Sequence, residues 1–386
     1  MKKIVIITNI PSPYRVAHYK FLQKVYKEYG FYIIFSKKES KSELREWGTS
    51  TAELENVNYL PCFAIVIKRK YDDHEIHITH GVGKKLSIIR PDVVICMEYN
   101  PTSIQAVLWC KWHKIPVISL TDGTLYSERN IGYLQKISRK FIMRNADAFI
   151  ASSTKAKEKI ESYHVGKNIY VSYLTVDVDK YFYEKVTNIV QGQLIFVGSL
   201  IERKGVDLLF KALAKVKVDY YLRIVGSGPL EQELKELAKR LDIDKKVEFC
   251  GYKQEEEVAE LYRESNILVL PTREDCYGLV ILEAMCASLP VIASKYADGA
   301  YDLIEEGKDG MIIDPYDTER FADSIDRMLV YNMKDNQWGR NAYRHAHEFS
   351  FERVSISFMN AVEETLAFAG TKKRITIVFE GSKDRI

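Results

Sequence analysis

Short runs of apolar, β-branched residues alternate with amphipathic stretches along most of the chain. In the first half, the runs cover residues 4–8, 32–35, 93–96, 117–119, 148–150 and 169–172. Helical periodicity falls between them, over residues 14–29, 102–113 and 134–144. Continuous apolar strands separated by helices are typical of a parallel sheet covered on both faces. This half is therefore predicted to form a doubly wound α/β domain.

The pattern starts again after a polar stretch over residues 177–192, which we interpret as a linker. Strand-like runs then cover residues 194–197, 221–225, 247–250, 267–270, 291–293 and 311–313, with helical patterns over 230–241, 255–264 and 279–287. Residues 318–369 lack strand patterns and are predicted to form three helices. We expect two tandem Rossmann-like domains, 1–188 and 189–370, that face a central cleft. The last helix is positioned to pack back on the first domain, and the tail 371–386 carries a strand-like run over 375–379.

Composition excludes a disordered or fibrous chain, because 46% of the 386 residues are hydrophobic and 28% are charged. The net charge of +3 conceals an uneven distribution. Through Lys185 basic residues outnumber acidic ones by 10, and in the remainder acidic residues are in excess by 7. This asymmetry suggests two domains with different partners.

We expect a cytoplasmic protein with reduced cysteines. The six cysteines form no C-x-x-C pair, and the apolar run at residues 4–7 is too short for a signal peptide. The histidines His18, His74, His77 and His80, with Asp73, are expected on helix surfaces, and no metal site is expected.

The densest chemical pattern runs over residues 271–292. Glu274 and Asp275 follow a predicted strand, and Tyr277 and Gly278 then open a helix that carries Glu283. A buried carboxylate on this helix needs a partner, and the vicinal diol of a ribose would fit. The alternative is that Asp275 caps the helix and that Glu283 is a solvated helix acid.

Backbone N–H groups at the start of this helix offer a phosphate site. The groups belong to Gly278, Leu279 and Val280, and the helix dipole adds to their attraction for an anion. A second pattern lies at residues 196–207, where Arg203 and Lys204 precede a helix. Cations at a helix start oppose the dipole, which favours a diphosphate-binding role over a solvated surface.

The acid-x7-Glu spacing of Asp275 and Glu283, with Tyr277-Gly278-Leu279 in register, resembles the family 4 glycosyltransferases of the GT-B fold. Asp275 stands where the family has Glu, with Glu274 immediately before it, so either acid is a candidate for contact with the sugar. Ser288 stands where the family usually has Gly. The resemblance implies a retaining enzyme that uses a nucleotide sugar.

Further site residues follow from this resemblance. Lys204 matches a family lysine in the loop after Gly198, whereas Ser199 replaces an arginine for which Arg203 can substitute. The G-x-G loop at Gly226 is predicted to line the nucleotide pocket, with a purely structural turn as the alternative. The resemblance places the loop at Gly251 and Tyr252 near the base.

The first domain offers fewer chemical patterns. Asp122, in a polar loop after a strand, is the candidate there for contact with the sugar or the acceptor; a simple turn is the alternative. Arg15 is a candidate for an anion contact or an ordinary helix residue, and Glu98 is a second acid at a strand end.

The implied function is transfer of a sugar to a saccharide or lipid-linked acceptor in polysaccharide or glycolipid synthesis. The expected donor is a UDP-linked hexose or N-acetylhexosamine. Asp275 or Glu274 would orient the sugar and Glu283 would hold the ribose. Arg203 and Lys204 would neutralise the diphosphate without a cofactor or metal. The alternatives are a nucleotide-sugar epimerase of the same architecture and, with no motif to support it, a nucleic-acid-binding protein.

The basic surplus of the first half suggests an anionic membrane surface as a further partner, at the inner face of the cell membrane. Three clusters carry it: Lys68, Arg69 and Lys70; Lys84 and Lys85; and Lys136, Arg139, Lys140 and Arg144. A set of solvated helix faces is the alternative.

Overall fold

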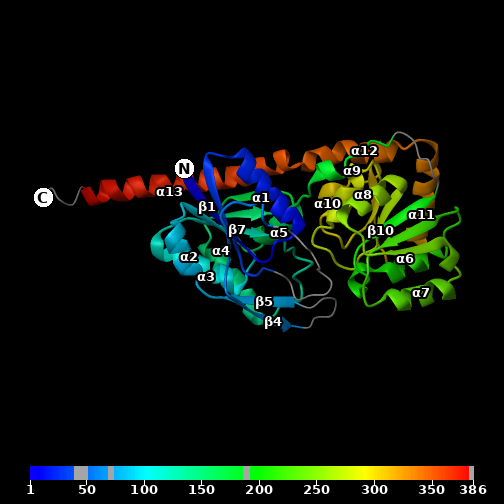
Figure 1. Cartoon of the computed structure of the whole chain (residues 1–386), viewed down its shortest axis with the longest axis horizontal. Coiled ribbons are helices and arrows are strands. Elements are labelled where there is room, and N and C mark those ends of the chain that lie inside the picture. Colours follow the sequence, from blue (N-terminus) through cyan, green and yellow to red (C-terminus); the bar gives the residue numbers. More distant parts are fainter. Residues whose placement is uncertain (39–50, 68–73, 186–191, 382–386) are drawn as a thin grey trace.

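Two parallel sheets, each flanked by helices, lie side by side in this computed structural model (Figure 1). The structure describes residues 1–38, 51–67, 74–185 and 192–381. The first sheet has the order β3-β2-β1-β6-β7-β8-β9. Its strands are β1 (Lys2–Thr8), β2 (Tyr29–Phe35), β3 (Val57–Tyr59), β6 (Val93–Met97), β7 (Val117–Thr121), β8 (Ala148–Ala151) and β9 (Ile169–Val171). The predicted doubly wound α/β architecture is confirmed.

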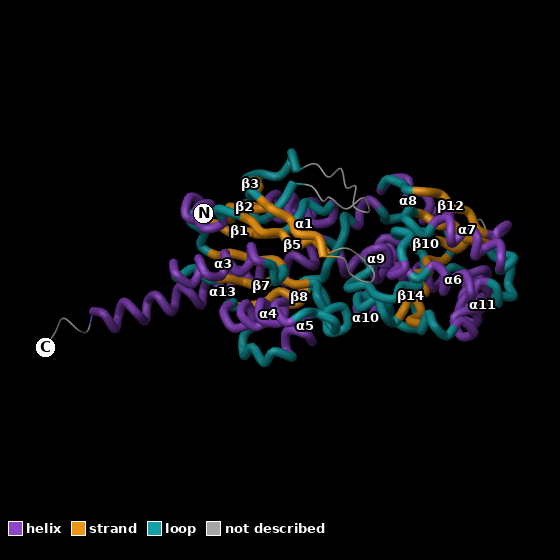
Figure 2. Tube along the Cα trace, turned by 90° about the horizontal axis from the view of Figure 1, so that it is seen from below, coloured by secondary structure: helices purple, strands orange, loops and turns teal. Residues whose placement is uncertain are grey.

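Helices cover both faces of the first sheet (Figure 2). One face carries α2 (Val82–Ile89), α3 (Pro101–His113), α4 (Tyr133–Asn145) and α5 (Thr154–Glu161), and the other carries α1 (Pro13–Val25) and α13 (Phe351–Gly381). The start of α3 shows why a helix begins at this point of the sequence: Asn100 accepts the Ser103 N–H, and Pro101 occupies the first helical position. An antiparallel hairpin of β4 (Cys62–Ile67) and β5 (His74–Thr79) packs beside α3.

The second sheet has the order β12-β11-β10-β13-β14-β15, again with parallel pairing throughout. Its strands are β10 (Gln193–Val197), β11 (Tyr221–Val225), β12 (Val247–Gly251), β13 (Ile267–Leu270), β14 (Val291–Ser294) and β15 (Gly310–Ile313). The helices are α6 (Val206–Leu213), α7 (Glu231–Arg240), α8 (Glu255–Glu264), α9 (Leu279–Cys286), α10 (Ala300–Leu303), α11 (Thr318–Lys334) and α12 (Gln337–Ala346). The predicted resumption of the strand–helix pattern is thus confirmed.

Helix α13 follows the second domain in sequence but packs on the first. Its residues Phe358, Met359 and Val362 are buried in one cluster with Ile4 and Ile6 of β1. The helix then runs on past the first sheet to Gly381 (Figure 1). The strand predicted over residues 375–379 is therefore wrong: a short apolar run fits either element, and an established helix extends more easily than a new strand forms.

Several local expectations also need correction. Helix α1 ends at Val25, and β2 begins at Tyr29 within the stretch predicted as helix. His74 and His77 lie on strand β5, not on a helix surface, and His77 is buried. His18 does lie on α1, but its ring stacks on Phe351.

Some predicted features lie outside the described residues. They are the basic cluster Lys68, Arg69 and Lys70, the acid Asp73, and the boundary predicted between residues 188 and 189.

We predict that Phe358→Ala will lower the free energy of unfolding by about 3–5 kcal/mol, because the side chain is fully buried where α13 meets the first sheet. Denaturant unfolding of the full chain, followed by circular dichroism, measures the change. Ile356→Ala on the same helix is the control, since Ile356 is exposed. An equal loss in both variants would contradict the packing described here.

Candidate active site

A cleft of about 2070 Å³ separates the two domains, and both contribute to its walls. In parallel α/β sheets the loops at the carboxyl ends of the strands carry the ligand sites. Here these loops face one another across the cleft. The first domain supplies α1 and the loop after β7, and the second supplies the loops after β10, β12 and β13.

A lysine and an aspartate from two loops of the second domain pair in this cleft. Lys204 Nζ lies 2.6 Å from Asp275 Oδ2, and Arg203 donates to the Glu274 carbonyl at 3.0 Å. Burial alone would raise the pKa of Asp275, but the ammonium of Lys204 and the guanidinium of Arg203 hold it below its usual range. Asp275 is therefore ionised at neutral pH.

Gly205 allows these two loops to approach. Its φ is +71°, and a Cβ atom there would lie 2.2 Å from the carbonyl oxygen of Pro271. The carbonyl of Arg203 accepts both the backbone N–H of Arg273, at 2.7 Å, and the Thr272 hydroxyl, at 2.9 Å. A larger residue at position 205 would separate the cationic loop from the acidic one.

Helix α9 begins at the cleft, and no side chain in the described part of the chain caps its first turn. Gly278 at its N-cap has a φ of +81°. Free N–H groups at a helix start attract an anion. Further along α9, the carboxyl of Glu283 accepts the Tyr262 hydroxyl at 3.0 Å. Burial raises the pKa of Glu283 to about 7, against the opposing effect of this hydrogen bond.

On the opposite wall Asp122 is fixed by two neighbours. Arg15 donates to its two carboxylate oxygens at 2.9 and 2.7 Å, and Ser152 donates to Oδ1 at 2.6 Å. Burial would lower the pKa of the Arg15 guanidinium, but Asp122, together with Tyr14 and Tyr19, raises the pKa above the ordinary value. Behind this pair, Glu98 accepts the Asp122 N–H, and burial raises the pKa of Glu98 to about 7.

The loop that carries Asp122 rests on a buried ion cluster. Arg139 donates to both oxygens of Glu128, at 2.5 and 2.6 Å, and Lys159 also contacts this carboxylate. A Cβ on Gly123 would lie 2.6 Å from Glu128 Oε1, so a larger residue there would have to displace this carboxylate. Arg139 therefore does not belong to an exposed basic face: that assignment is wrong, because the guanidinium is buried against Glu128.

The same loop reaches across the cleft. Arg129 donates to Glu274 Oε2 at 2.6 Å and stacks on Tyr126, whose ring in turn stacks on Tyr296. Thr154 donates through its backbone N–H and hydroxyl to Asp302, at 2.9 and 2.5 Å. The two domains are thus joined by direct polar contacts beside the candidate site.

Most of the residues predicted from sequence line this cleft. The first wall contributes Asp122, and the second contributes Gly198, Ser199, Arg203, Lys204, Tyr252, Glu274, Asp275, Tyr277, Gly278, Leu279, Val280 and Glu283. Gly226 and Gly251 are not among its lining residues. Gly226 instead supports the wall from behind, since a Cβ there would lie 2.1 Å from the carbonyl oxygen of Gly198.

Sequence reasoning missed Tyr262, Arg129 and Ser152 as partners of Glu283, Glu274 and Asp122. Each lies far along the chain from its partner, so no spacing pattern links them. Residues 177–181, the start of the stretch interpreted as a linker, also line the cleft. Ser288 has a φ of +59°, the left-handed conformation that favours glycine, and its hydroxyl donates to the Tyr183 carbonyl.

The sequences of both domains match known family models. Residues 55–180 match the family described as glycosyltransferase family 4, and residues 179–345 match glycosyl transferases group 1. A glycosyltransferase of Haemophilus influenzae described as uncharacterized is 34% identical over 148 residues, 38% of this chain and 41% of that protein. The D-inositol 3-phosphate glycosyltransferase of Saccharomonospora viridis is 29% identical over 197 residues, 48% of this chain and 46% of that protein. The matched region is thus less than half of either relative.

Structural similarity extends over nearly the whole chain. The crystal structure of Anabaena HepE in complex with UDP has a TM-score of 0.74 at 18% sequence identity, covering 94% of this chain and all of that one. This similarity shows the fold, two Rossmann-like domains about a cleft.

We predict that Glu283→Gln will change the pH dependence of stability. The folded-state pKa of about 7 exceeds the ordinary value of 4.5, so the folded chain holds a proton that the unfolded chain releases. Stability therefore falls as pH rises from about 4.5 to 7, by roughly 3 kcal/mol. The variant lacks this loss. Between pH 4 and 8, its free energy of unfolding should therefore rise by that amount relative to that of wild type, as measured by denaturant unfolding.

Tyr262→Phe is the matched variant for this measurement. It removes the hydrogen bond that favours the ionised carboxylate, so it should move the upper end of the pH window to higher pH. Parallel stability profiles for wild type and Glu283→Gln would show that Glu283 does not titrate in this range.

Proposed function

We propose that this chain transfers a sugar from a nucleotide donor with retention of anomeric configuration. The premise is that it belongs to the glycosyltransferases, whose family models match residues 55–345. The donor is a UDP-linked hexose or N-acetylhexosamine, and the acceptor is a saccharide or lipid-linked hydroxyl in polysaccharide or glycolipid synthesis.

One observation carries the proposal: two cations and an uncapped helix start converge on the cleft wall that also holds Glu283. Arg203 and Lys204 come from the loop after β10, and Gly278 from the loop after β13. Glu283 is about one and a half turns into α9. This order suits a diphosphate at the helix start and a ribose diol at Glu283. The UDP bound by Anabaena HepE, a protein of the same fold, supports the choice of nucleotide.

The proposed reaction needs no protein nucleophile. The acceptor oxygen bonds to the anomeric carbon on the face from which the diphosphate departs, as the bond from that carbon to the phosphate oxygen breaks. The acceptor proton passes to a phosphate oxygen of the leaving UDP. Arg203 and Lys204 then stabilise the charge that develops on this diphosphate.

The acids around the cleft orient the sugar. Asp275 is held by Lys204, and Glu274 by Arg129 from the other domain. A diphosphate that pairs with Lys204 would release Asp275 to accept sugar hydroxyls. Asp122, fixed by Arg15, faces the acceptor side. Since two side chains supply the positive charge, we expect turnover to persist in EDTA.

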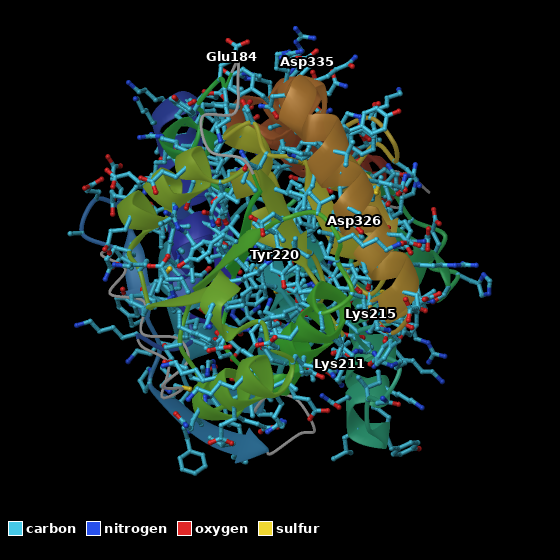
Figure 3. The ribbon with its side chains drawn as sticks, turned by 90° about the vertical axis from the view of Figure 1, so that its right-hand side faces the viewer. Glu184, Lys211, Lys215, Tyr220, Asp326 and Asp335 are labelled. Atoms are coloured by element: carbon cyan, nitrogen blue, oxygen red, sulfur yellow. The ribbon has the colours of Figure 1, made fainter. Side chains whose placement is uncertain are left out.

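We predict that Lys204→Ala will lower turnover of the donor by about 10²–10³-fold, because the departing diphosphate loses a cation. The rate of UDP release measures it. Lys211→Ala is the control: Lys211 lies on the end of the second domain shown in Figure 3, and it does not line the cleft. Wild-type turnover in Lys204→Ala would remove this residue from the site.

The reaction class is tested with a panel of UDP-, GDP- and ADP-sugars, with and without acceptors. A transferase releases free nucleotide, slowly to water and rapidly when a suitable acceptor is present. A nucleotide-sugar epimerase would instead convert the donor to its epimer without an acceptor. That product, with no release of UDP, would overturn the proposal.

A further inference from the structure

Three neighbouring helices of the first domain carry basic residues but no acidic ones. Helices α2, α3 and α4 pack side by side on one face of the first sheet, in the lower left part of Figure 1. Not one of their residues is Asp or Glu. An ordinary solvated helix face mixes charges of both signs, as α7 and α8 of the second domain do. Exclusion of acids from three adjacent helices therefore indicates an anionic partner.

The same helices expose large apolar side chains. Trp112 is 85% exposed, Leu134 80% and Tyr133 78%. Ile88, Leu108 and Ile137 are exposed as well. In the second domain, most of the exposed large hydrophobic residues are tyrosines. Apolar groups are thus presented to solvent on the very helices that lack acids.

Exposed cations surround these apolar groups. Lys84 lies on α2, Lys111 on α3, and Lys136, Lys140 and Arg144 on α4. Lys111 lies 3.5 Å from Asp147, whereas Lys136 and Lys140 have no carboxylate partner among the residues that the structure describes. Two cations on α4 are therefore available to an external anion.

We propose that α2, α3 and α4 form a docking surface for an anionic lipid bilayer, with Trp112, Tyr133 and Leu134 inserted at the headgroup level and the lysines on the lipid phosphates. Aromatic and leucine side chains beside lysines, with no acids, match the composition of interfacial membrane-binding helices. None of the described helices is both long and apolar enough to cross a bilayer.

A bilayer fits this surface better than a protein partner. The apolar side chains come from three separate helices and stand singly among lysines, whereas the core of a protein interface is depleted of lysine. The surface also continues into the cleft: Arg129 and Asn130 line the cleft, and Tyr133 begins α4 three residues later. If the proposed function holds, a surface that is continuous with the cleft would bring a lipid-linked acceptor from the membrane to the site.

Flotation of the full chain with vesicles tests the surface without any assay of activity. We expect binding to phosphatidylcholine vesicles that contain phosphatidylglycerol, weakened by salt, and little binding to phosphatidylcholine alone. Lys136→Glu/Lys140→Glu should lower the affinity at least about tenfold. Tyr133→Ser/Leu134→Ser should lower it by removing the inserted groups.

The control is Lys239→Glu/Arg240→Glu on α7, which makes the same charge change on the exposed end of a helix in the second domain. It should bind as wild type does. An equal loss of vesicle binding in the control would show that net charge alone causes the effect, which would contradict a specific surface. Absence of vesicle binding by wild type would overturn the proposed docking surface. Self-association of wild type that the α4 variants abolish would identify a second copy as the partner and likewise overturn it. Donor hydrolysis by the α4 variants is expected to stay at the wild-type rate, so failure of the surface and failure of the proposed function are separable.

Discussion

The arrangement of the cleft depends on ion pairing, because removing a charge from water is unfavourable unless the charge meets a partner. Lys204 meets Asp275, Arg15 meets Asp122, and Arg129 meets Glu274. These pairs hold the side chains in defined positions before any ligand enters. An entering anion can take one member of a pair, and it then leaves the other free to accept a hydrogen bond.

The fold supplies these charges from both sides. Parallel pairing sends the loops of each sheet to its carboxyl edge, and the two edges face one another. Helix α13 ties the domains together by packing against the first sheet after leaving the second. The buried cluster of Glu128, Arg139 and Lys159 supports the loop that crosses the cleft. The scaffold thus fixes the cleft through a few contacts between elements distant in sequence.

The sheets, the cleft and most of the wall residues were predictable from sequence, because strands buried on both faces leave continuous apolar runs and their loops carry the polar residues. Partners were not. Tyr262, on α8, meets Glu283, on α9, only in the folded chain. The amphipathic pattern of α4 predicted an exposed Arg139, whose guanidinium the structure instead buries against Glu128. The apolar run over residues 375–379 was ambiguous, since a short run fits a strand or a helix equally.

The most direct test of this account is a crystal structure with UDP bound. We expect the diphosphate to lie over the first turn of α9, within hydrogen-bonding distance of Arg203 and Lys204, with the ribose hydroxyls on Glu283. We also expect the Lys204–Asp275 contact to lengthen. A nucleotide bound at the loop between β1 and α1, with the Lys204–Asp275 pair intact, would contradict it.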